Sequence, residues 1–326
     1  MKVAVLRGGR SDEYDISLVT AGAVDEALRA RGHEVLQVTL GRHGGASWGE
    51  RGAGRVSQAF DAMEAWEPDA AFIAMHGEYG EDGRVQGALE VIGVPYQGSD
   101  VTASAVAMDK ARAKAVYRAV GLPVADDVTL TPEQLSSANW AEIASRVGLP
   151  CVLKTAESGS SVGIEVVGVG EDLAEVGRRM LATTTSLLVE AWLPGREFTV
   201  AVLEDAQGTP AALPVVEIRP HGDRWFDYET KYDPTAVDEL CPAPIDGAMA
   251  DRLMDLGVRA HRALRCRDYS RTDIKLDSDG RPRLMETNTL PGLTPASLMP
   301  KAAAAAGLAF DALIEQLVGR AVSRRR

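Results

Sequence analysis

The residues best suited to chemistry lie together near the carboxyl end of the chain, in the segment RTDIKLDSDGRPRLMETNT, residues 271–289. The Asp-Ser-Asp-Gly in its middle is typical of a turn, so the segment is predicted to form a β-hairpin. Side chains two residues apart share a face of a strand, which groups Arg271 with Asp273 and Glu286 with Asn288. Across such a turn the two groups are expected to lie roughly opposite one another.

This predicted group supplies three oxygen ligands and an adjacent guanidinium. Mg²⁺ bound together with a phosphate substrate prefers hard oxygen ligands and takes few protein carboxylates. The pattern therefore predicts a magnesium site formed by Asp273, Glu286 and Asn288. A solvated hairpin with surface charges is the alternative, although the apolar, turn-rich LPGLTP after Asn288 is unusual next to a plain edge strand.

A second candidate is the segment AESGSSVG, residues 156–163, which begins two residues after Lys154. Small residues between two strands leave backbone N–H groups able to bind phosphate, and a lysine adds positive charge. A surface loop is the more ordinary explanation of a Ser/Gly run. The segment does not match the Walker A pattern, so it does not indicate a P-loop enzyme.

Two glycine-rich segments follow predicted strands in the first quarter of the chain, GGRSDEYDIS at 8–17 and HGEYGEDGRVQG at 76–87. Glycine lets the backbone approach a ligand closely. An ordinary alternative stays open for each segment. His76 is also typical of a satisfied core or turn residue, and carboxylates near residue 13 also favour the N-terminus of a helix.

The elements that must position these residues begin with a strand, a helix and a strand. Apolar residues favour buried strands at 2–6 and 34–40 and a helix between them at 17–31. This order implies an α/β domain with a parallel sheet and ligand groups at the strand ends. The sequence further predicts a loop at 41–55, strands at 70–75 and 91–96, and one helix from 101 to 121.

A second, mixed α+β region is predicted to begin near residue 101. Residues 131–134 combine an N-cap, a proline and a capping-box partner, which is typical of a helix start. Pro295 is predicted to begin another helix, whose N–H groups near Ser297 suit the binding of an anion.

Length and charge narrow the classes of function. The 326 residues correspond to roughly two domains at about 150 residues each. A net charge of −12 argues against nucleic acid and anionic membranes as partners, but not against a small anionic substrate. Three cysteines without metal-like spacing indicate neither a disulfide framework nor a zinc site, and they fit a reducing cytoplasm. The apolar run at 3–6 is too short for a signal sequence or a membrane span.

Taken in order, these segments resemble the D-alanine:D-alanine ligase family of ATP-grasp enzymes, from Gly8 to about Leu313. The number of matches in the family's order makes the resemblance specific. The matching blocks are GGRSDEYDIS, HGEYGEDGRVQG, VPYQGSD, SAVAMDK, KTAESGSSVG, VEAWLPGREFTV, FDYETKY, CPAPI and METNTLPGLTPAS.

The resemblance implies an ATP-grasp fold preceded by a parallel-sheet α/β domain. The expected parts are an N-terminal domain over 1–101, a central subdomain over 102–187 and a C-terminal subdomain over 188–326, with ATP between the last two. The implied enzyme is a cytoplasmic, ATP-dependent carbon–nitrogen ligase that joins two D-alanines through an acyl phosphate for peptidoglycan synthesis and cell wall biogenesis. It is expected to use ATP and Mg²⁺, with two ions per site and Mn²⁺ as a substitute, and to form a homodimer.

The resemblance also implies a role for each matched residue. The positions that match catalytic residues are Glu13, Ser160, Tyr232, Arg271 and Gly292. The positions that match ATP contacts are Lys110, Lys154, Ser161, Glu190, Trp192, Leu193 and Glu197. The positions that match substrate contacts are His76, Lys231, Ser297 and Leu298, and those that match magnesium ligands are Asp273, Glu286 and Asn288.

The chain departs from the family pattern at Thr155, Ser158 and the pair Pro295-Ala296. None of these departures removes a matched chemical group, but they affect the expected acceptor pocket and the closure of its loop. Two alternatives follow. One is an ATP-grasp ligase of a secondary pathway that couples other amino acids, and the other is a catalytically inactive, nucleotide-binding regulatory homologue.

Overall fold

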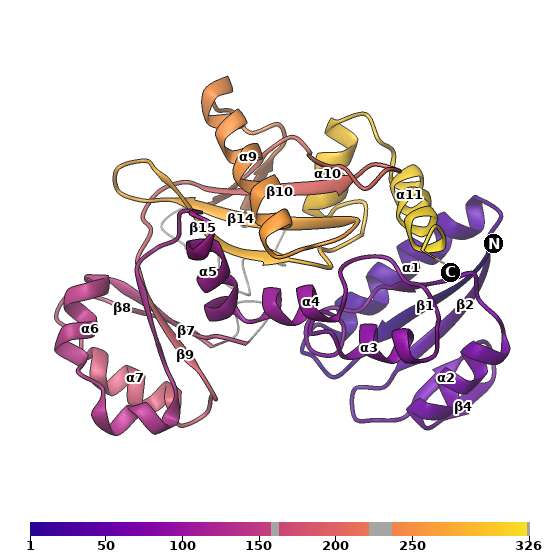
Figure 1. The fold of residues 1–326 in the computed structure, drawn as a ribbon, viewed down its shortest axis with the longest axis horizontal. Helices are drawn as coiled ribbons and strands as arrows, with labels where there is room; N and C mark the ends of the chain where they lie inside the picture. Colours follow the sequence, from indigo (N-terminus) through magenta and orange to yellow (C-terminus); the bar gives the residue numbers. More distant parts are fainter. Residues whose placement is uncertain (158–162, 222–236, 325–326) are drawn as a thin grey trace.

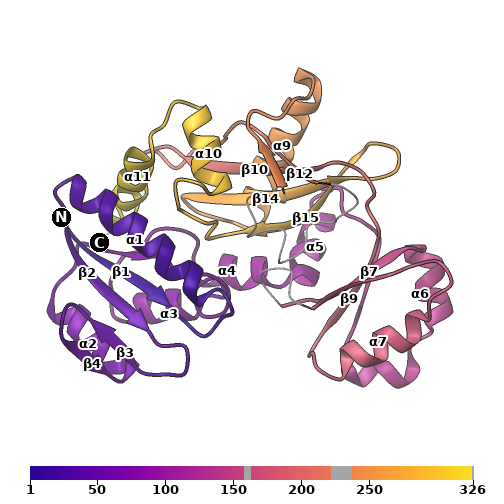
Figure 2. The same cartoon turned by 180° about the vertical axis from the view of Figure 1, so that it is seen from behind.

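The computed structural model describes residues 1–157, 163–221 and 237–324. Its strands form three sheets, and helices pack against each of them (Figure 1). Figures 1 and 2 show a five-stranded sheet at one end of the molecule and a four-stranded sheet at the other, with the largest sheet between them.

The five-stranded sheet has the order β4-β3-β2-β1-β5, and β1 pairs in parallel with both β2 and β5. Residues 3–6 of β1 are fully buried, as expected for a central strand with helices on both faces. The predicted parallel sheet is therefore confirmed. Its strands are β1 (Lys2–Gly8), β2 (Glu34–Leu40), β3 (Ala46–Trp48), β4 (Gly52–Gly54) and β5 (Ala70–Ile73), and its helices are α1 (Tyr14–Ala30), α2 (Val56–Ala65) and α3 (Arg84–Val91).

Three of the predicted elements around this sheet are wrong. Residues 41–55 are not only a loop, because β3 and β4 extend the sheet antiparallel to β2. Residues 91–96 do not form a strand: α3 ends at Val91, and Tyr96 makes only an isolated bridge to Ala71. The helix predicted over 101–121 is two helices, α4 (Val101–Met108) and α5 (Lys110–Ala119), because Asp109 is extended and its side chain caps α5.

The four-stranded sheet has the order β6-β9-β7-β8 and is antiparallel throughout. Helices α6 and α7 cover one of its faces (Figure 1), and their apolar side chains form a separate core with it. The predicted capping box begins a 3₁₀ helix at Pro132–Ser137. The other elements are β6 (Asp127–Leu130), α6 (Trp140–Val147), β7 (Cys151–Thr155), β8 (Ile164–Val167), α7 (Leu173–Leu181) and β9 (Leu187–Ala191).

The six-stranded sheet has the order β13-β12-β10-β14-β15, with β11 also paired to β10. Helix α9 packs on one of its faces, and α5 contacts β15. The helix expected at Pro295 begins later, at Leu298, with Ser297 as its N-cap. The elements are β10 (Glu197–Glu204), β11 (Pro210–Ala212), β12 (Val216–Pro220), β13 (Val237–Leu240), α9 (Gly247–Ala263), β14 (Tyr269–Leu276), β15 (Pro282–Asn288), α10 (Leu298–Ala305) and α11 (Phe310–Val322).

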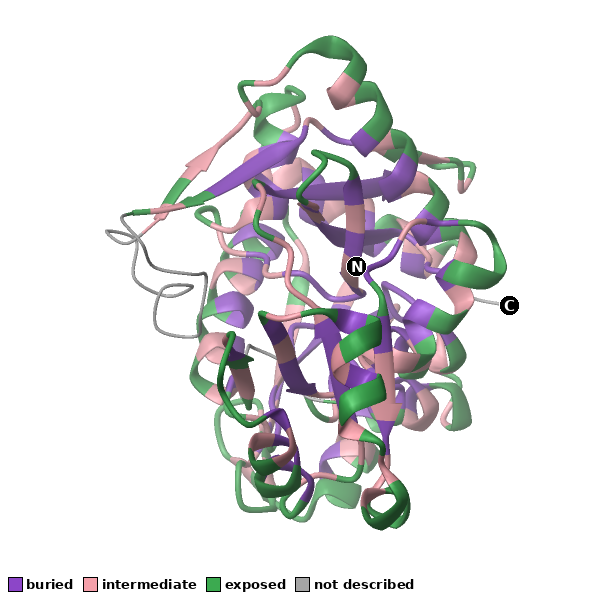
Figure 3. Ribbon diagram, turned by 90° about the vertical axis from the view of Figure 1, so that its left-hand side faces the viewer, coloured by how far each residue is buried: buried purple, intermediate pink, exposed green. Residues whose placement is uncertain are grey.

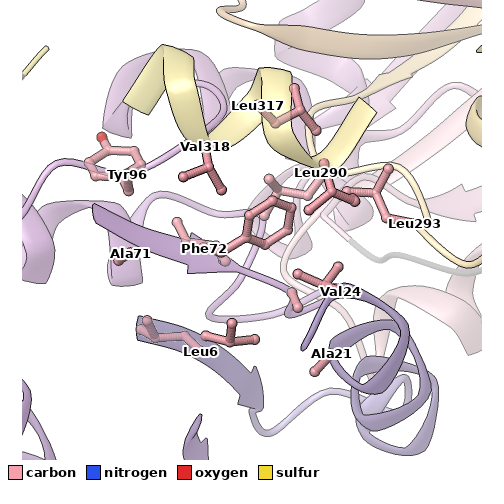
Figure 4. Packing of buried hydrophobic residues seen from close by; sticks show 14 of the residues in the cluster. Leu6, Ala21, Val24, Ala71, Phe72, Tyr96, Leu290, Leu293, Leu317 and Val318 are labelled. Atoms are coloured by element: carbon pink, nitrogen blue, oxygen red, sulfur yellow. The ribbon is translucent and has the colours of Figure 1, made fainter. Parts of the chain in front are cut away.

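The largest core joins the two ends of the chain. Leu6 and Phe72 of the five-stranded sheet lie in one cluster with Leu290, Leu317 and Val318 (Figure 4). The strands β1, β5, β10 and β14 are largely buried, whereas the outer faces of the helices are exposed (Figure 3). Among the described residues no single helix is long and apolar enough to cross a membrane. Only α10 and α11 taken together have such a length and composition, and a bend of 105° separates them.

Candidate active site

The hairpin predicted at 271–289 is formed by β14 and β15. Arg271 lies opposite Asn288, and Asp273 lies opposite Glu286. The predicted register is therefore confirmed, and it brings these four residues together. The register shifts directly after Asp273, which ends this regular pairing.

Arg271 and Asp273 form a buried, two-pronged ion pair. Nε and Nη2 of Arg271 donate to the two carboxylate oxygens of Asp273, each at 2.9 Å. Thr199 Oγ1 donates to Asp273 Oδ1 at 2.6 Å. Burial acts to lower the pKa of Arg271, but Asp273, Glu286 and Glu81 outweigh it and raise that pKa. Arg271 is therefore a fixed positive charge at this end of the hairpin.

Two further acids lie around the same hairpin. Glu286 pairs with Lys110 of α5 at 3.0 Å, and Glu197 of β10 pairs with Lys275 at 3.4 Å. Burial raises the pKa of the Glu197 carboxyl; Lys275 opposes this rise, while Asp273 and Glu286 add to it. The site therefore places three carboxylates, each paired with a basic side chain, around one end of the hairpin.

The donor set of Asp273, Glu286 and Asn288 fits a hard divalent cation, because it combines two carboxylates with an amide oxygen. Asn288 Oδ1 accepts a hydrogen bond from the Leu290 backbone at 2.8 Å, which orients the amide. In the part of the chain that the structure describes, no three His, Cys, Asp or Glu side chains form a metal-binding group. The candidate site therefore depends on the asparagine as its third ligand.

A second charged group lies on the four-stranded sheet. Glu190 of β9 and Lys154 of β7 are on neighbouring strands, and Lys114 reaches the same carboxylate from α5. All three side chains are buried. Burial acts to raise the pKa of Glu190, but Lys154 and Lys114 outweigh it and lower that pKa to about 2. Glu190 is therefore ionised and held between two ammonium groups.

The sequence analysis did not identify Lys114 as a site residue. A lysine one turn after another lysine in a helix is usually solvated, yet this side chain has no exposed surface. The available signal was the four-residue spacing of three basic residues on one face of α5. Each of them pairs with an acid of a neighbouring sheet: Lys110 with Glu286, Lys114 with Glu190 and Arg118 with Asp127.

Trp192 and Leu193 lie in the connection from β9 to β10, and so between the four-stranded and the six-stranded sheet. The Lys275 ammonium is 5.3 Å from the centre of the Trp192 ring. Because Lys275 also pairs with Glu197, this connection lies beside the acidic group of the large sheet. Glu190, at the end of β9, lies at the start of the same connection.

Glu13 is positioned by the glycine turn after β1. Gly8 has a φ of +84°, and a Cβ there would lie 2.2 Å from the Leu40 carbonyl oxygen, so this position requires glycine. The turn leads to Glu13, the N-cap residue of α1, whose side chain makes no capping hydrogen bond. Instead Glu13 lines a cavity of about 630 Å³, together with residues of 77–84 and of α4 and α5.

His76 is buried at the end of the segment that follows β5. Its Nε2 lies 2.9 Å from Thr20 Oγ1, and its Nδ1 lies 3.5 Å from Glu81 Oε1. Glu81 is among the acids that raise the pKa of Arg271, so the carboxylate beside His76 lies within electrostatic reach of that guanidinium. The structure therefore brings the His76 segment toward Arg271.

Gly292, Ser297 and Leu298 lie together after the hairpin. A Cβ at Gly292 would come within 2.9 Å of Ser297 Oγ, so glycine permits this contact. Ser297 Oγ also lies 2.8 Å from Thr294 Oγ1 and makes no capping bond to α10. The N-terminus of α10 therefore begins beside Gly292, at Leu298 rather than at Pro295. The predicted residues Ser160, Ser161, Lys231 and Tyr232 lie outside the described residues.

Comparison with known families matches nearly the whole chain. Residues 2–99 match the family described as D-ala D-ala ligase N-terminus, and residues 116–319 match D-ala D-ala ligase C-terminus. The D-alanine--D-alanine ligase of Desulfotalea psychrophila is 41% identical over 98% of this chain and 94% of its own.

Solved structures agree with this match. D-alanine--D-alanine ligase from Bacillus anthracis complexed with ATP has a TM-score of 0.80 and 28% identity, over 100% of this chain and 98% of its own. VanG D-Ala:D-Ser ligase from Enterococcus faecalis has a TM-score of 0.83 and 28% identity, over 98% of this chain and 99% of its own.

Proposed function

Because the chain belongs to the D-alanine–D-alanine ligase family, we propose that it joins two molecules of D-alanine with the conversion of ATP to ADP and phosphate. The observation that carries this proposal is the register of β14 and β15, which places Arg271, Asp273, Glu286 and Asn288 together. The family also confirms the expected ATP-grasp fold with an N-terminal α/β domain.

In the proposed reaction the carboxylate of the first D-alanine attacks the γ-phosphate of ATP, giving an acyl phosphate and ADP. The amine of the second D-alanine then attacks the acyl carbon, loses a proton and expels phosphate, so that D-alanyl-D-alanine remains. A free carboxylate is a poor electrophile, and the acyl phosphate supplies the leaving group. The chain's residues then act by positioning the reactants and by neutralising charge.

We propose that ATP lies between the four-stranded and six-stranded sheets. Glu190 offers a carboxylate acceptor to the adenine amino group, next to Trp192 and Leu193, and Glu197 accepts from the ribose hydroxyls. Lys154 and Lys110 supply positive charge to the phosphates. The positions of these residues support this assignment. Glu190, Trp192 and Leu193 lie at the connection between the two sheets, Lys154 pairs with Glu190, and Lys110 pairs with Glu286 of the hairpin.

We further propose that Asp273, Glu286 and Asn288 hold Mg²⁺, which when bound neutralises phosphate charge. Arg271 keeps the Asp273 carboxylate in place by pairing with it. Arg271 and the Gly292 backbone then face the negative charge that develops on the reacting carbonyl oxygen.

We assign the two D-alanine molecules to opposite sides of the reacting carbonyl oxygen. Glu13, in its cavity, receives the ammonium of the first D-alanine. Ser297 and Leu298, at the N-terminus of α10, receive the carboxylate of the second, with His76 nearby. Ser160, Ser161, Lys231 and Tyr232 are proposed to take part from segments outside the described residues.

We propose a three-part organisation of the chain. The first part ends near residue 101, as the sequence indicates. Because β9 pairs within the four-stranded sheet, we place the second boundary in the connection at 192–196, slightly after residue 187. We also propose that the protein acts as a homodimer in the cytoplasm, where it makes a peptidoglycan precursor. The free thiols of all three cysteines support a cytoplasmic location.

The proposal is tested by incubating the purified protein with ATP, Mg²⁺ and D-alanine as sole amino acid, and by measuring dipeptide by mass spectrometry and phosphate release. D-alanyl-D-alanine is the expected product. L-alanine, D-serine and D-lactate, alone and paired with D-alanine, test the secondary-pathway alternative. The Asn288→Ala variant is the control: an ATP turnover by the natural protein no faster than that of this variant would support the inactive homologue instead.

A further inference from the structure

One face of α5 carries three basic residues at a spacing of four, and it connects the two sheets that enclose the proposed nucleotide site. The acids that pair with them come from β15, β9 and β6. Side chains four residues apart in a helix share a face, so one helix sets the distance between these three acids. The middle pair, Lys114 with Glu190, lies on the sheet that is proposed to hold the adenine.

Lys114 differs from its two neighbours in exposure. Its side chain is 0% exposed, against 11% for Lys110 and 41% for Arg118. Burial lowers the pKa of Lys114, Glu190 opposes this, and Lys154 adds to the lowering. A fully buried ammonium is costly unless it has a partner, and Glu190 is that partner.

The two lysines share one carboxylate. The Lys114 ammonium contacts Glu190 Oε2, while the Lys154 ammonium contacts Oε1. A lysine that also binds phosphate cannot be the permanent counter-charge of Glu190. We infer that Lys114 is a positioning residue for the nucleotide. Its ammonium group holds the Glu190 carboxylate ionised and oriented toward the adenine amino group, while Lys154 binds the phosphates. This inference rests on the proposed function, because that function assigns Glu190 to adenine and Lys154 to phosphate.

The first test is Lys114→Met, which keeps the length of the side chain and removes its charge. We expect the Kd of ATP, measured calorimetrically with Mg²⁺ and without D-alanine, to rise by about tenfold or more, since a charged hydrogen bond acts through Glu190. The KM for ATP should rise in parallel, whereas kcat at saturating ATP should stay within about threefold. Arg118→Met is the matched control, because it removes another ion pair of the same helix face, with Asp127, and leaves the contacts of Lys114 and Lys154 with Glu190 in place.

Inosine triphosphate provides a second readout, because its base carries a carbonyl where adenine carries the amino group. The natural protein is expected to prefer ATP, and Lys114→Met to lose most of this preference. Arg118→Met should keep it. A general loss of stability would weaken the binding of both nucleotides equally, so an unchanged preference in Lys114→Met would overturn the inference.

A double-mutant cycle with Glu190→Gln separates positioning from simple packing. If Lys114 acts through Glu190, Lys114→Met should change the Kd of ATP by less than about twofold in the Glu190→Gln background. An equal fold-change in both backgrounds would contradict the inference. If Lys114→Met alone does not fold, the double variant is compared with Glu190→Gln, and a change in the Kd of ATP of more than about twofold would contradict the inference. Since binding is measured without D-alanine, a natural protein that binds ATP but makes no dipeptide would refute the proposed function and not this inference.

Discussion

The proposed role of Arg271 is to stabilise negative charge that develops only during the reaction. Its contacts with Asp273 use Nε and Nη2, so Nη1 is directed away from that carboxylate. The guanidinium is buried and orientated before any substrate binds. Preorganised positive charge of this kind stabilises a developing oxyanion without rearrangement at the moment of reaction.

Replacing Arg271 by methionine should therefore impair chemistry more than nucleotide binding. We expect kcat for D-alanine ligation to fall by roughly 10²-fold or more, the range for loss of one oxyanion-stabilising group, with the Kd of ATP within about threefold. Steady-state kinetics and calorimetry measure the two effects. Arg283→Met, which removes the pair with Asp277 on the same hairpin, is the control. A kcat close to that of the natural protein would refute the role of Arg271.

Residue types and spacing identified some of the candidate site but not all of it. Arg271, Asp273, Glu286 and Asn288 could be grouped because alternation along a strand depends only on sequence. The contact of Glu190 with Lys114 could not, because it depends on how α5 approaches β9. A helix with lysines every four residues is compatible both with solvent and with a buried acid, and only the tertiary structure distinguishes them.

Among the elements, the strands of continuous apolar residues were predictable and the short ones were not. β1 is apolar on both faces, so its sequence indicates a central strand. β3 and β4 have three residues each and contain glycine, alanine and serine, so they lack the alternation that indicates a strand. Residues 91–96 are mostly apolar, but Val91 ends α3, and the rest meet the sheet only at an isolated bridge between Tyr96 and Ala71 and through packing of Val94 in the same core.

The contact between α5 and β9 has a consequence for acid stability. Glu190 has a pKa of about 2 in the folded protein, below its ordinary value of 4.5. Because the folded-state pKa is the lower one, this contribution is fully present above about pH 4.5 and is lost as the pH falls toward 2. We therefore expect the difference in urea midpoint between the natural protein and Glu190→Gln to be largest near pH 7 and to shrink over that interval.

Urea unfolding followed by tryptophan fluorescence at a series of pH values measures this difference. Glu50→Gln, a substitution in an exposed loop, is the control and should change the midpoint little at every pH. A difference for Glu190→Gln that is independent of pH between 7 and 2 would show that its ionised carboxylate does not stabilise the link between α5 and β9.

For the whole molecule, the last helix is one of the elements that join the N-terminal sheet to the rest of the chain. α11 packs against α1 and β5, although more than 230 residues separate α11 from β5. The apolar face of residues 310–322 predicts burial, but sequence alone does not name the surface that buries it. The proposed site has residues on all three sheets, so this contact also fixes the position of Glu13 and His76 relative to the hairpin.

Asp268 adds polar interactions to the apolar contact between α11 and the N-terminal sheet, and its side chain is completely buried. Its carboxylate accepts a hydrogen bond from the Gly98 backbone at 2.7 Å and pairs with Arg320 and Arg324 at 3.2 and 2.6 Å. Three distant segments of the chain thus meet at one carboxylate. Removal of one partner of such a buried pair costs about 3–5 kcal/mol, because the remaining charges lose their partner.

We therefore expect Asp268→Asn to lower Tm by about 5 °C or more, as a cost of that size implies for a chain of this length. Differential scanning calorimetry measures the shift. Arg281→Ala is the matched control, because it breaks an ion pair with Asp279 in which both side chains are more than 60% exposed. Such surface pairs contribute about 1 kcal/mol or less, so Tm should change little. If the two variants shifted Tm equally, the buried Asp268 pairs would not be what holds the N-terminal sheet, α11 and the large sheet together.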